Sequence, residues 1–194
     1  NGIGKSSLVQ MMSTRGFPSS GTVDILGNRL GKVDVFSYRN RIGLSSAELA
    51  RAFPPNEDPL DAVVTALTAT TGRWRDEYTA EDFAKARGLM EEFGIAYLEG
   101  KQMFKLSEGE RTRVLLAALF LRDNNFLLID EPTNHLDMEG RAMLREYLLS
   151  KKGFILVSHD RAFLDGCVDH ILSINRANIT VTRGNLSTWW ENKA

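Results

Sequence analysis

Apolar residues in the second half of the chain fall into short uninterrupted blocks separated by amphipathic stretches. The blocks are Phe126–Ile129 and Phe154–Val157, each four residues long. Helical periodicity surrounds them, at Ser107–Leu121, Met138–Leu149 and Asp160–Asp165. Short, fully apolar strands between helices are typical of parallel sheets buried on both faces. We therefore predict an α/β fold with a mainly parallel sheet covered by helices, with further strands at His170–Ile174 and Ile179–Thr182.

The first half begins with helical periodicity and then changes to short strands. We predict a helix over Lys5–Thr14, ended by the Pro, Ser and Gly residues at 18–21. A strand is expected at Thr22–Leu26, with a turn at Gly27-Asn28. Arg41–Leu44 is a further short strand candidate.

A mainly helical segment follows, from Asp58 to about Gln102. Asp58 is placed to cap a helix whose first turn contains Pro59. The second helix is expected over Thr79–Phe93, because Thr79 and the acidic residue three positions later have the spacing of a capping box.

Composition narrows the class of protein without identifying it. The 194 residues are 43% hydrophobic and 25% charged, as in a soluble globular protein of one domain or two lobes. The net charge of −1 gives no overall basic field for nucleic acid. A single cysteine, Cys167, cannot form an internal disulfide, so we expect a reducing, cytoplasmic location. No apolar run approaches ~18 residues, so we expect no direct membrane insertion.

The first seven residues match the end of the phosphate-loop pattern G-x-x-x-x-G-K-[ST]. Backbone N–H groups of such a loop wrap phosphates, and the positive N-terminus of the next helix adds to the attraction. The pattern's first glycine and its feeding strand would precede the printed sequence, so we expect N-terminal strands to be missing from it. The candidate nucleotide-binding residues are Asn1, Gly2, Gly4, Lys5, Ser6 and Ser7.

Two acidic residues end the apolar block at Phe126–Ile129. Asp130 is the candidate metal ligand, together with the Ser6 hydroxyl, because oxygen ligands suit Mg²⁺. Glu131 is the candidate catalytic base, which would orient and polarise an attacking water.

Polar residues also stand at two other element ends, the start of a predicted helix and the end of a predicted strand. Ser107 and Glu110 have the spacing of a capping box, and the same helix start can serve as an anion site. His159 follows the block at Phe154–Val157, at a strand end where open parallel sheets collect ligands, so we expect it to contact a terminal phosphate.

The order of these motifs resembles an ATP-binding cassette (ABC) ATPase, a P-loop NTPase with a helical signature lobe. The resemblance implies ATP and Mg²⁺ as ligands and a second ABC cassette as partner, paired head to tail. It also implies that Ser107, Gly109 and Glu110 serve the nucleotide on the partner cassette. The loop with Asn134, His135 and Asp137 resembles the one that crosses this interface.

This resemblance divides the chain into four segments. Residues 1–57 would be the N-terminal part of the catalytic core, and residues 58–105 the helical lobe. Residues 106–184 would contain the signature helix and the C-terminal part of the core, and residues 185–194 a terminal helix or the start of a linker.

The two halves resemble different subfamilies. Glu131–Asp137 and Ser158–Asp165 have the sequence pattern typical of the soluble ABC-F family. The C-terminal segment, from Asp169–Arg176 through Gly184–Trp190, resembles the end of the first cassette in the antibiotic-resistance branch of that family. Arg41–Leu49 and Asp61–Ala66 instead resemble ATPases of molybdenum-uptake systems. One departure concerns the glutamine that most cassettes have after this strand: none stands between Ile42 and Asn56, and Ser46 or Glu48 are the candidate substitutes.

The expected function is therefore an ATPase of the ABC-F type that acts on the ribosome or its tRNA, as a translation factor or in antibiotic resistance by ribosome protection. The alternative is the ATP-binding subunit of an importer, partnered by a membrane permease subunit on another chain. A third possibility is that the chain as printed is inactive, because its phosphate loop is incomplete.

Overall fold

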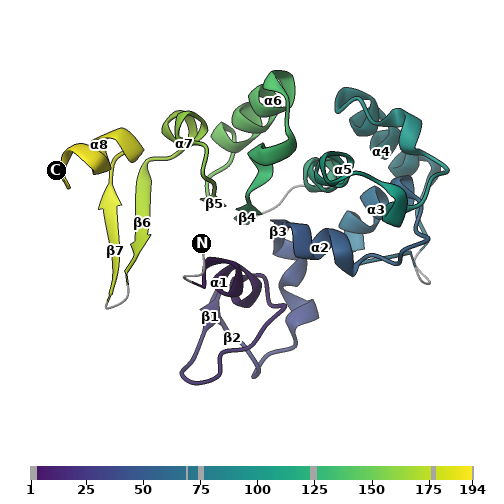
Figure 1. Ribbon diagram of the computed structural model, residues 1–194. Helices are drawn as coiled ribbons and strands as arrows, with labels where there is room; N and C mark the ends of the chain where they lie inside the picture. Colours follow the sequence, from purple (N-terminus) through teal and green to yellow (C-terminus); the bar gives the residue numbers. More distant parts are fainter. Residues whose placement is uncertain (1–3, 69, 74–76, 123–125, 176–177, 194) are drawn as a thin grey trace.

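A three-stranded parallel sheet organises the chain (Figure 1). The computed structural model describes residues 4–68, 70–73, 77–122, 126–175 and 178–193. The sheet order is β3-β4-β5, formed by Ile42–Ser45, Phe126–Asp130 and Phe154–Val157. Leu128 of the central strand lies opposite Leu44 on one side and Ile155 on the other. Because all three strands run the same way, their carboxyl ends meet at one edge, and the predicted α/β fold is confirmed.

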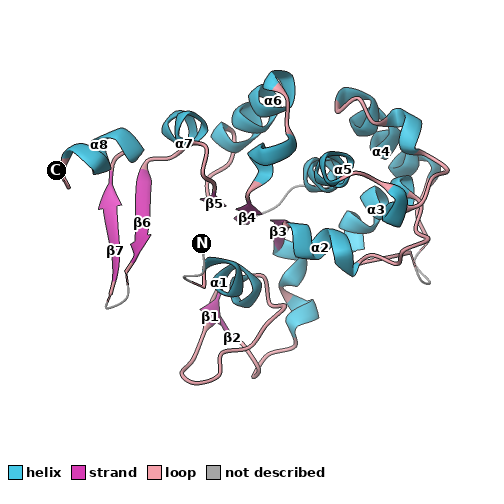
Figure 2. Cartoon of the chain, in the orientation of Figure 1, coloured by secondary structure: helices cyan, strands magenta, loops and turns pink. Residues whose placement is uncertain are grey.

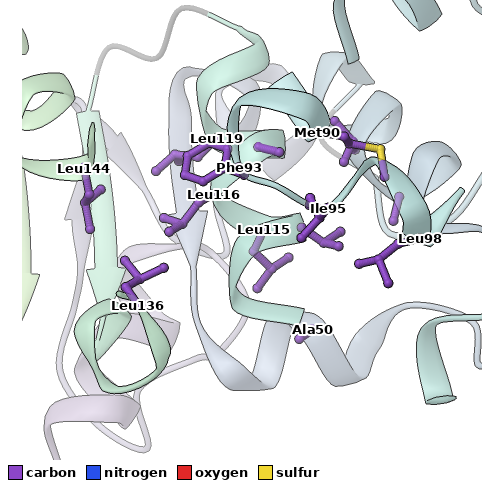
Figure 3. Close-up of a cluster of buried hydrophobic side chains, with 14 of the residues drawn as sticks. Ala50, Met90, Phe93, Ile95, Leu98, Leu115, Leu116, Leu119, Leu136 and Leu144 are labelled. Atoms are coloured by element: carbon purple, nitrogen blue, oxygen red, sulfur yellow. The ribbon is translucent and has the colours of Figure 1, made fainter. Parts of the chain in front are cut away.

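The central strand β4 is buried on both faces, as its uninterrupted apolar sequence predicts. Successive side chains of a strand point to opposite faces. Leu127 and Ile129 accordingly join the large core beneath the helices, whereas Leu128 packs with Val9 and Ile42 on the opposite face. Figure 3 shows the large core. Burying each such side chain stabilises the fold by about 1.5–3 kcal/mol. This burial fixes the position of β4 and therefore of Asp130 at its carboxyl end.

Helices make up the segment between β3 and β4 in the described residues (Figure 2). Three of them start where the sequence predicts, since Asp58, Thr79 and Ser107 each cap a helix with a side-chain oxygen. Thr79 and Ser107 both complete capping boxes. The helices are α2 (Ala47–Ala52), α3 (Pro59–Val64), α4 (Ala80–Glu92) and α5 (Glu108–Leu121).

The remaining elements follow β4. Helices α6 (Met138–Leu149) and α7 (Arg161–Cys167) flank β5, and α8 (Leu186–Glu191) ends the described chain. Strands β6 (His170–Ile174) and β7 (Ile179–Arg183) are present as predicted, but they pair antiparallel with each other and form a separate hairpin. Helix α7 continues two residues beyond the predicted end at Asp165. No helix in the described ranges is both long and apolar enough to cross a membrane.

The structure corrects the predicted bounds near the N-terminus. Helix α1 covers Lys5–Met12 and ends before Thr14, whose φ of 66° lies in the left-handed region. The predicted strand at Thr22–Leu26 is reduced to β1 (Asp24–Ile25), paired with β2 (Asn28–Arg29). Leu26 and Gly27 both have positive φ, 49° and 80°, as the two central residues of a tight hairpin turn require. The turn therefore lies one residue earlier than predicted.

The expectation that β5 is fully buried is wrong. All four of its residues are half-buried, although β3, the other edge strand of the sheet, is mostly buried. A cavity of about 790 Å³ lies beside it, with α1 and β6 contributing further apolar side chains. The sequence pattern of β5 is nevertheless that of a strand covered on both faces.

Candidate active site

The N-terminus of α1 is open to an anion. Gly4 precedes the helix with a φ of 81°, a backbone conformation that glycine adopts without strain. Among the described residues, no side chain caps this helix and no acidic residue lies in its first turn. The first amide groups of Lys5, Ser6 and Ser7 are therefore available to a phosphate. Asn1 and Gly2, also predicted to bind nucleotide, lie outside the described residues.

The end of β4 brings Asp130 to this helix. The Ser6 hydroxyl donates to Asp130 Oδ2 at 3.4 Å, across 124 residues of sequence. Burial raises the pKa of Asp130, while the Ser6 hydrogen bond and the charge of Lys5 oppose that rise. A hydroxyl beside a half-buried carboxylate offers the oxygen ligands that Mg²⁺ prefers, so the two predicted metal-binding residues fit such an ion.

Glu131 leaves the strand with a sharp turn. Its φ of 49° is unusual for a residue with a Cβ, and its amide donates to the Val157 carbonyl at 2.7 Å. One carboxylate oxygen lies 3.1 Å from His159 Nε2, and the other accepts from the His159 amide at 3.2 Å. The structure thus places the two predicted catalytic side chains against each other and fixes the orientation of the carboxylate.

These groups converge on one cavity of about 700 Å³. Its lining includes residues from α1, the ends of all three parallel strands, the start of α5 and the loop after β4. Of the predicted site residues, Ser107, Gly109, Glu110 and Asp137 do not line it, whereas nine do: Gly4, Lys5, Ser6, Ser7, Asp130, Glu131, Asn134, His135 and His159.

The start of α5 is closed by its own side chains. The Ser107 hydroxyl accepts from the Glu110 amide at 3.2 Å, and Glu110 accepts from the Ser107 amide at 2.8 Å. Tyr97 donates a further hydrogen bond to Glu110 at 2.9 Å. The Ser107 amide and Tyr97 lower the pKa of Glu110. Within this chain, the predicted signature residues are therefore satisfied locally.

The predicted interface loop packs on this helix. A Cβ added at Gly109 would lie 3.4 Å from the Cβ of His135, so glycine lets the loop approach closely. Arg113 of α5 pairs with Asp137 at 3.3 Å. The loop and the signature helix thus form one surface beside the cavity.

Two contacts that hold segments beside the cavity in place were not predicted from the sequence. Arg141 of α6 donates to the carbonyls of Thr133 and Leu136, each at 3.1 Å, and so holds the loop after β4 in place. Gln10 of α1 contacts the Glu48 carboxylate in the first turn of α2. The only sequence signal for Arg141 is its position one turn after the helix cap at Asp137, which does not indicate a partner.

Comparisons with known proteins agree with this arrangement. The sequence profile of the ABC transporter family matches residues 1–134. An uncharacterized ABC transporter ATP-binding protein of Bacillus subtilis, YlmA, is 31% identical over 78% of this chain and 59% of its own length. The energy-dependent translational throttle protein EttA of Mycobacterium tuberculosis is 31% identical over the whole of this chain and 38% of its own length. The chain thus spans less than two thirds of either relative.

Among solved structures, the dimeric bacterial ABC transporter cassette MJ0796 superposes with a TM-score of 0.75. The match covers 94% of this chain and 82% of that one at 19% identity, which shows a shared fold. The profile match over more than half of the sequence and the motif order at the cavity lead to one assignment. The chain belongs to the ABC transporter family, as one of its ATP-binding cassettes.

Proposed function

We propose that this chain binds ATP with Mg²⁺ and hydrolyses it at the cavity between α1 and the end of β4. The observation that supports this most strongly is the convergence of Lys5, Ser6, Asp130, Glu131 and His159 on that one cavity. These residues come from three separate segments of the chain, and together they supply cationic, metal-binding and basic groups.

Each side chain has a role that follows from its chemistry. Lys5 and the α1 amide groups bind the phosphates, and Ser6 and Asp130 would hold Mg²⁺. When bound, that ion neutralises charge on the phosphate oxygens. Glu131 accepts the proton of the attacking water, and its contact with His159 keeps the carboxylate directed at the cavity. His159 is also placed to donate a hydrogen bond to a terminal phosphate.

The cassette acts with a second cassette in this proposal. The dimeric MJ0796 structure supports such a partner through the shared fold. Ser107, Gly109 and Glu110 would face the nucleotide of the partner, with Asn134, His135 and Asp137 at the interface. Their clustering in one surface of α5 and the adjoining loop is consistent with that assignment.

The biological setting that we propose is the ribosome, with a cytoplasmic protein of the ABC-F type. Two features support it. Residues 131–137 and 158–165 have the sequence pattern typical of the ABC-F family, and the whole chain matches a relative named as a translational throttle protein. Ribosome protection and antibiotic resistance remain the narrower form of the same hypothesis.

Co-sedimentation with ribosomes tests this setting. Glu131→Gln should hydrolyse ATP slowly and so accumulate the ATP-bound form, which we expect to sediment with ribosomes only when ATP is present. The double variant Lys5→Ala/Glu131→Gln should not sediment, because it lacks the phosphate contact. Glu139→Gln, an exposed carboxylate of α6, is the matched control and should behave as wild type. ATP-independent sedimentation, or none by the Glu131→Gln protein, would exclude the ribosomal role.

The importer alternative has its own support. The relative YlmA matches 78% of this chain, and Arg41–Leu49 resembles molybdenum-uptake ATPases. In that case the Glu131→Gln protein should associate with a membrane permease subunit in detergent extracts and not with ribosomes. The same pull-down from fractionated cells therefore separates the two functions, while the ATPase proposal is common to both.

A further inference from the structure

Arg141 of α6 contacts both of the loops that carry catalytic side chains to the nucleotide cavity. Its Nε donates to the Leu136 carbonyl and its Nη2 to the Thr133 carbonyl, each at 3.1 Å. Its Nη1 donates to the carboxylate of Asp160. Leu136 and Thr133 belong to the loop after β4, whereas Asp160 belongs to the loop after β5. One guanidinium group therefore joins the two loops, and each of its three nitrogens has a partner.

In the loop after β4, Arg141 binds the residues on both sides of the pair Asn134 and His135. Thr133 precedes this pair and Leu136 follows it, and both are buried, whereas the pair itself is exposed. Asn134 and His135 line the nucleotide cavity. Because the two flanking carbonyls bind the same side chain, the backbone between them is fixed beside the cavity.

In the loop after β5, Asp160 is anchored by its neighbours. One of its carboxylate oxygens accepts from the Phe163 amide at 3.0 Å and so caps α7. The Asp160 amide donates to the Ser158 hydroxyl at 3.1 Å. That hydroxyl lies 3.1 Å from the Thr133 hydroxyl, which is a second link between the two loops. His159 stands between these two anchored residues, so its backbone is fixed from both sides.

The contact between Glu131 and His159 needs the two loops to keep a constant separation. Glu131 begins the loop after β4, and His159 lies in the loop after β5. Both oxygens of the Glu131 carboxylate contact His159, one at the ring and one at the amide. The φ of 49° at Glu131 is a conformation that surrounding contacts must maintain. A side chain that binds both loops provides such contacts.

We propose that Arg141 is a positioning residue for hydrolysis, which aligns His159 with Glu131 by binding both loops at once. Arg141 is not among the described residues that line the cavity, so it acts through its neighbours and not on the nucleotide. Its planar guanidinium group has donors in fixed directions, whereas a lysine ammonium is a point charge on a flexible stem. Lysine therefore cannot bind the same three oxygens in the same way. This inference rests on the proposed ATPase function.

Kinetics of ATP hydrolysis separate positioning from binding. Arg141→Ala should lower kcat by about 10- to 100-fold, because the reacting groups lose their alignment. Affinity for a non-hydrolysable ATP analogue should stay unchanged, because the phosphate loop is untouched. Arg141→Lys should also lower kcat, by a smaller factor. Arg145→Ala removes an exposed arginine one turn later on α6, which donates to neither loop in the described part of the chain, and should keep the kcat of wild type.

A double-variant cycle tests whether Arg141 acts through Asp160. Asp160→Asn keeps an oxygen that can cap α7 but removes the charge that Arg141 binds, so kcat should fall in this variant too. Arg141→Ala/Asp160→Asn should lose no more activity than Arg141→Ala alone, because both changes break the same contact. Losses that multiply would contradict the proposal. If circular dichroism shows that Arg141→Ala does not fold, a wild-type kcat in both Arg141→Lys and Asp160→Asn would also contradict it.

Amide chemical shifts of the nucleotide-free protein give a readout that needs no ATP hydrolysis. Arg141→Ala should move the amide signals of Asn134 and His159 together, and should leave those of Ser6 and Ser7 in place. The proposal is overturned if Arg141→Ala keeps the kcat of wild type, if its ATP affinity falls as much as its kcat, or if the His159 amide does not move. If wild type itself does not hydrolyse ATP, the proposed function fails, while the shifts still decide whether Arg141 joins the loops.

Discussion

The N-termini of α1 and α5 are the same structural feature with opposite chemistry. Both are helix starts near the carboxyl edge of the parallel sheet, and the sequence marks both as possible anion sites. At α1 the described residues provide no side-chain cap and no first-turn acid, so the amide groups and the positive end of the helix are left for a ligand. At α5, Ser107, Glu110 and Tyr97 satisfy the helix end from within the chain.

The difference between the two helix ends means that one stabilises the fold and the other is available to bind a ligand. The closed end of α5 contributes to the free energy of unfolding whether or not nucleotide is present. The open end of α1 contributes little until a phosphate arrives, which is what a binding site should do. For Ser107 to contact a nucleotide on a partner cassette, its hydroxyl must donate to that ligand while still accepting from the Glu110 amide, and a hydroxyl can do both.

The largest expected effect lies beside α1, at Glu131. Glu131→Gln removes the proposed proton acceptor but keeps the side-chain shape, so kcat for ATP hydrolysis should fall by about 10²–10⁴. ATP affinity, measured by titration, should change little. Glu139→Gln is the control with the same chemical change at an exposed position. A kcat that is the same in Glu131→Gln and wild type would remove Glu131 from the mechanism.

The next effect compares the two helix starts directly. Ser107→Ala should lower the free energy of unfolding by about 1 kcal/mol, because the cap of α5 is lost. Ser6→Ala should lower it by less than about 0.5 kcal/mol, since its contact with Asp130 is long and exposed. Urea denaturation without nucleotide measures both. If Ser6→Ala were the more damaging of the two, the open helix end would be a structural one and the comparison would fail.

The smallest effect concerns pH at the closed end. The pKa of Glu110 is lowered in the folded protein, first by the Ser107 amide and then by Tyr97. A depressed pKa means that the carboxylate stabilises the fold above its unfolded pKa, near 4.3. This stabilisation is lost as pH falls through the folded value. Glu110→Gln should therefore melt at a lower temperature than wild type at pH 7, with a gap that narrows below about pH 4. A gap that widens on acidification would contradict the assigned sign.

Local sequence signals predicted much of this fold. The bounds of α6 and β5 are as predicted, and so are the caps at Asp58, Thr79 and Ser107, because those features depend on neighbouring residues alone. The apolar block of β4 followed by two acids also predicted the corner where Asp130 and Glu131 lie. Periodicity and capping therefore located the main elements. Nine of the predicted site residues line one cavity.

What the sequence left open depends on contacts between distant segments. The left-handed Thr14 that ends α1 is held by Arg39, 25 residues away. Arg141 is an ordinary helix residue until the loop carbonyls reach it. Apolar patterning predicted the strands of the β6–β7 hairpin but could not show that they pair outside the parallel sheet. The two halves of the sequence resemble different subfamilies. The fold does not distinguish between these subfamilies, because it is common to ABC cassettes.

The central claim is that phosphates bind at the open N-terminus of α1, and backbone amide chemical shifts test it most directly. A non-hydrolysable ATP analogue with Mg²⁺ would be titrated into dilute protein, with the monomeric state verified by sedimentation. The account predicts large shifts for the amides of Lys5, Ser6 and Ser7, and little change for those of Glu108, Gly109 and Glu110. Shifts confined to Glu108–Glu110, with the α1 amides unchanged, would contradict it.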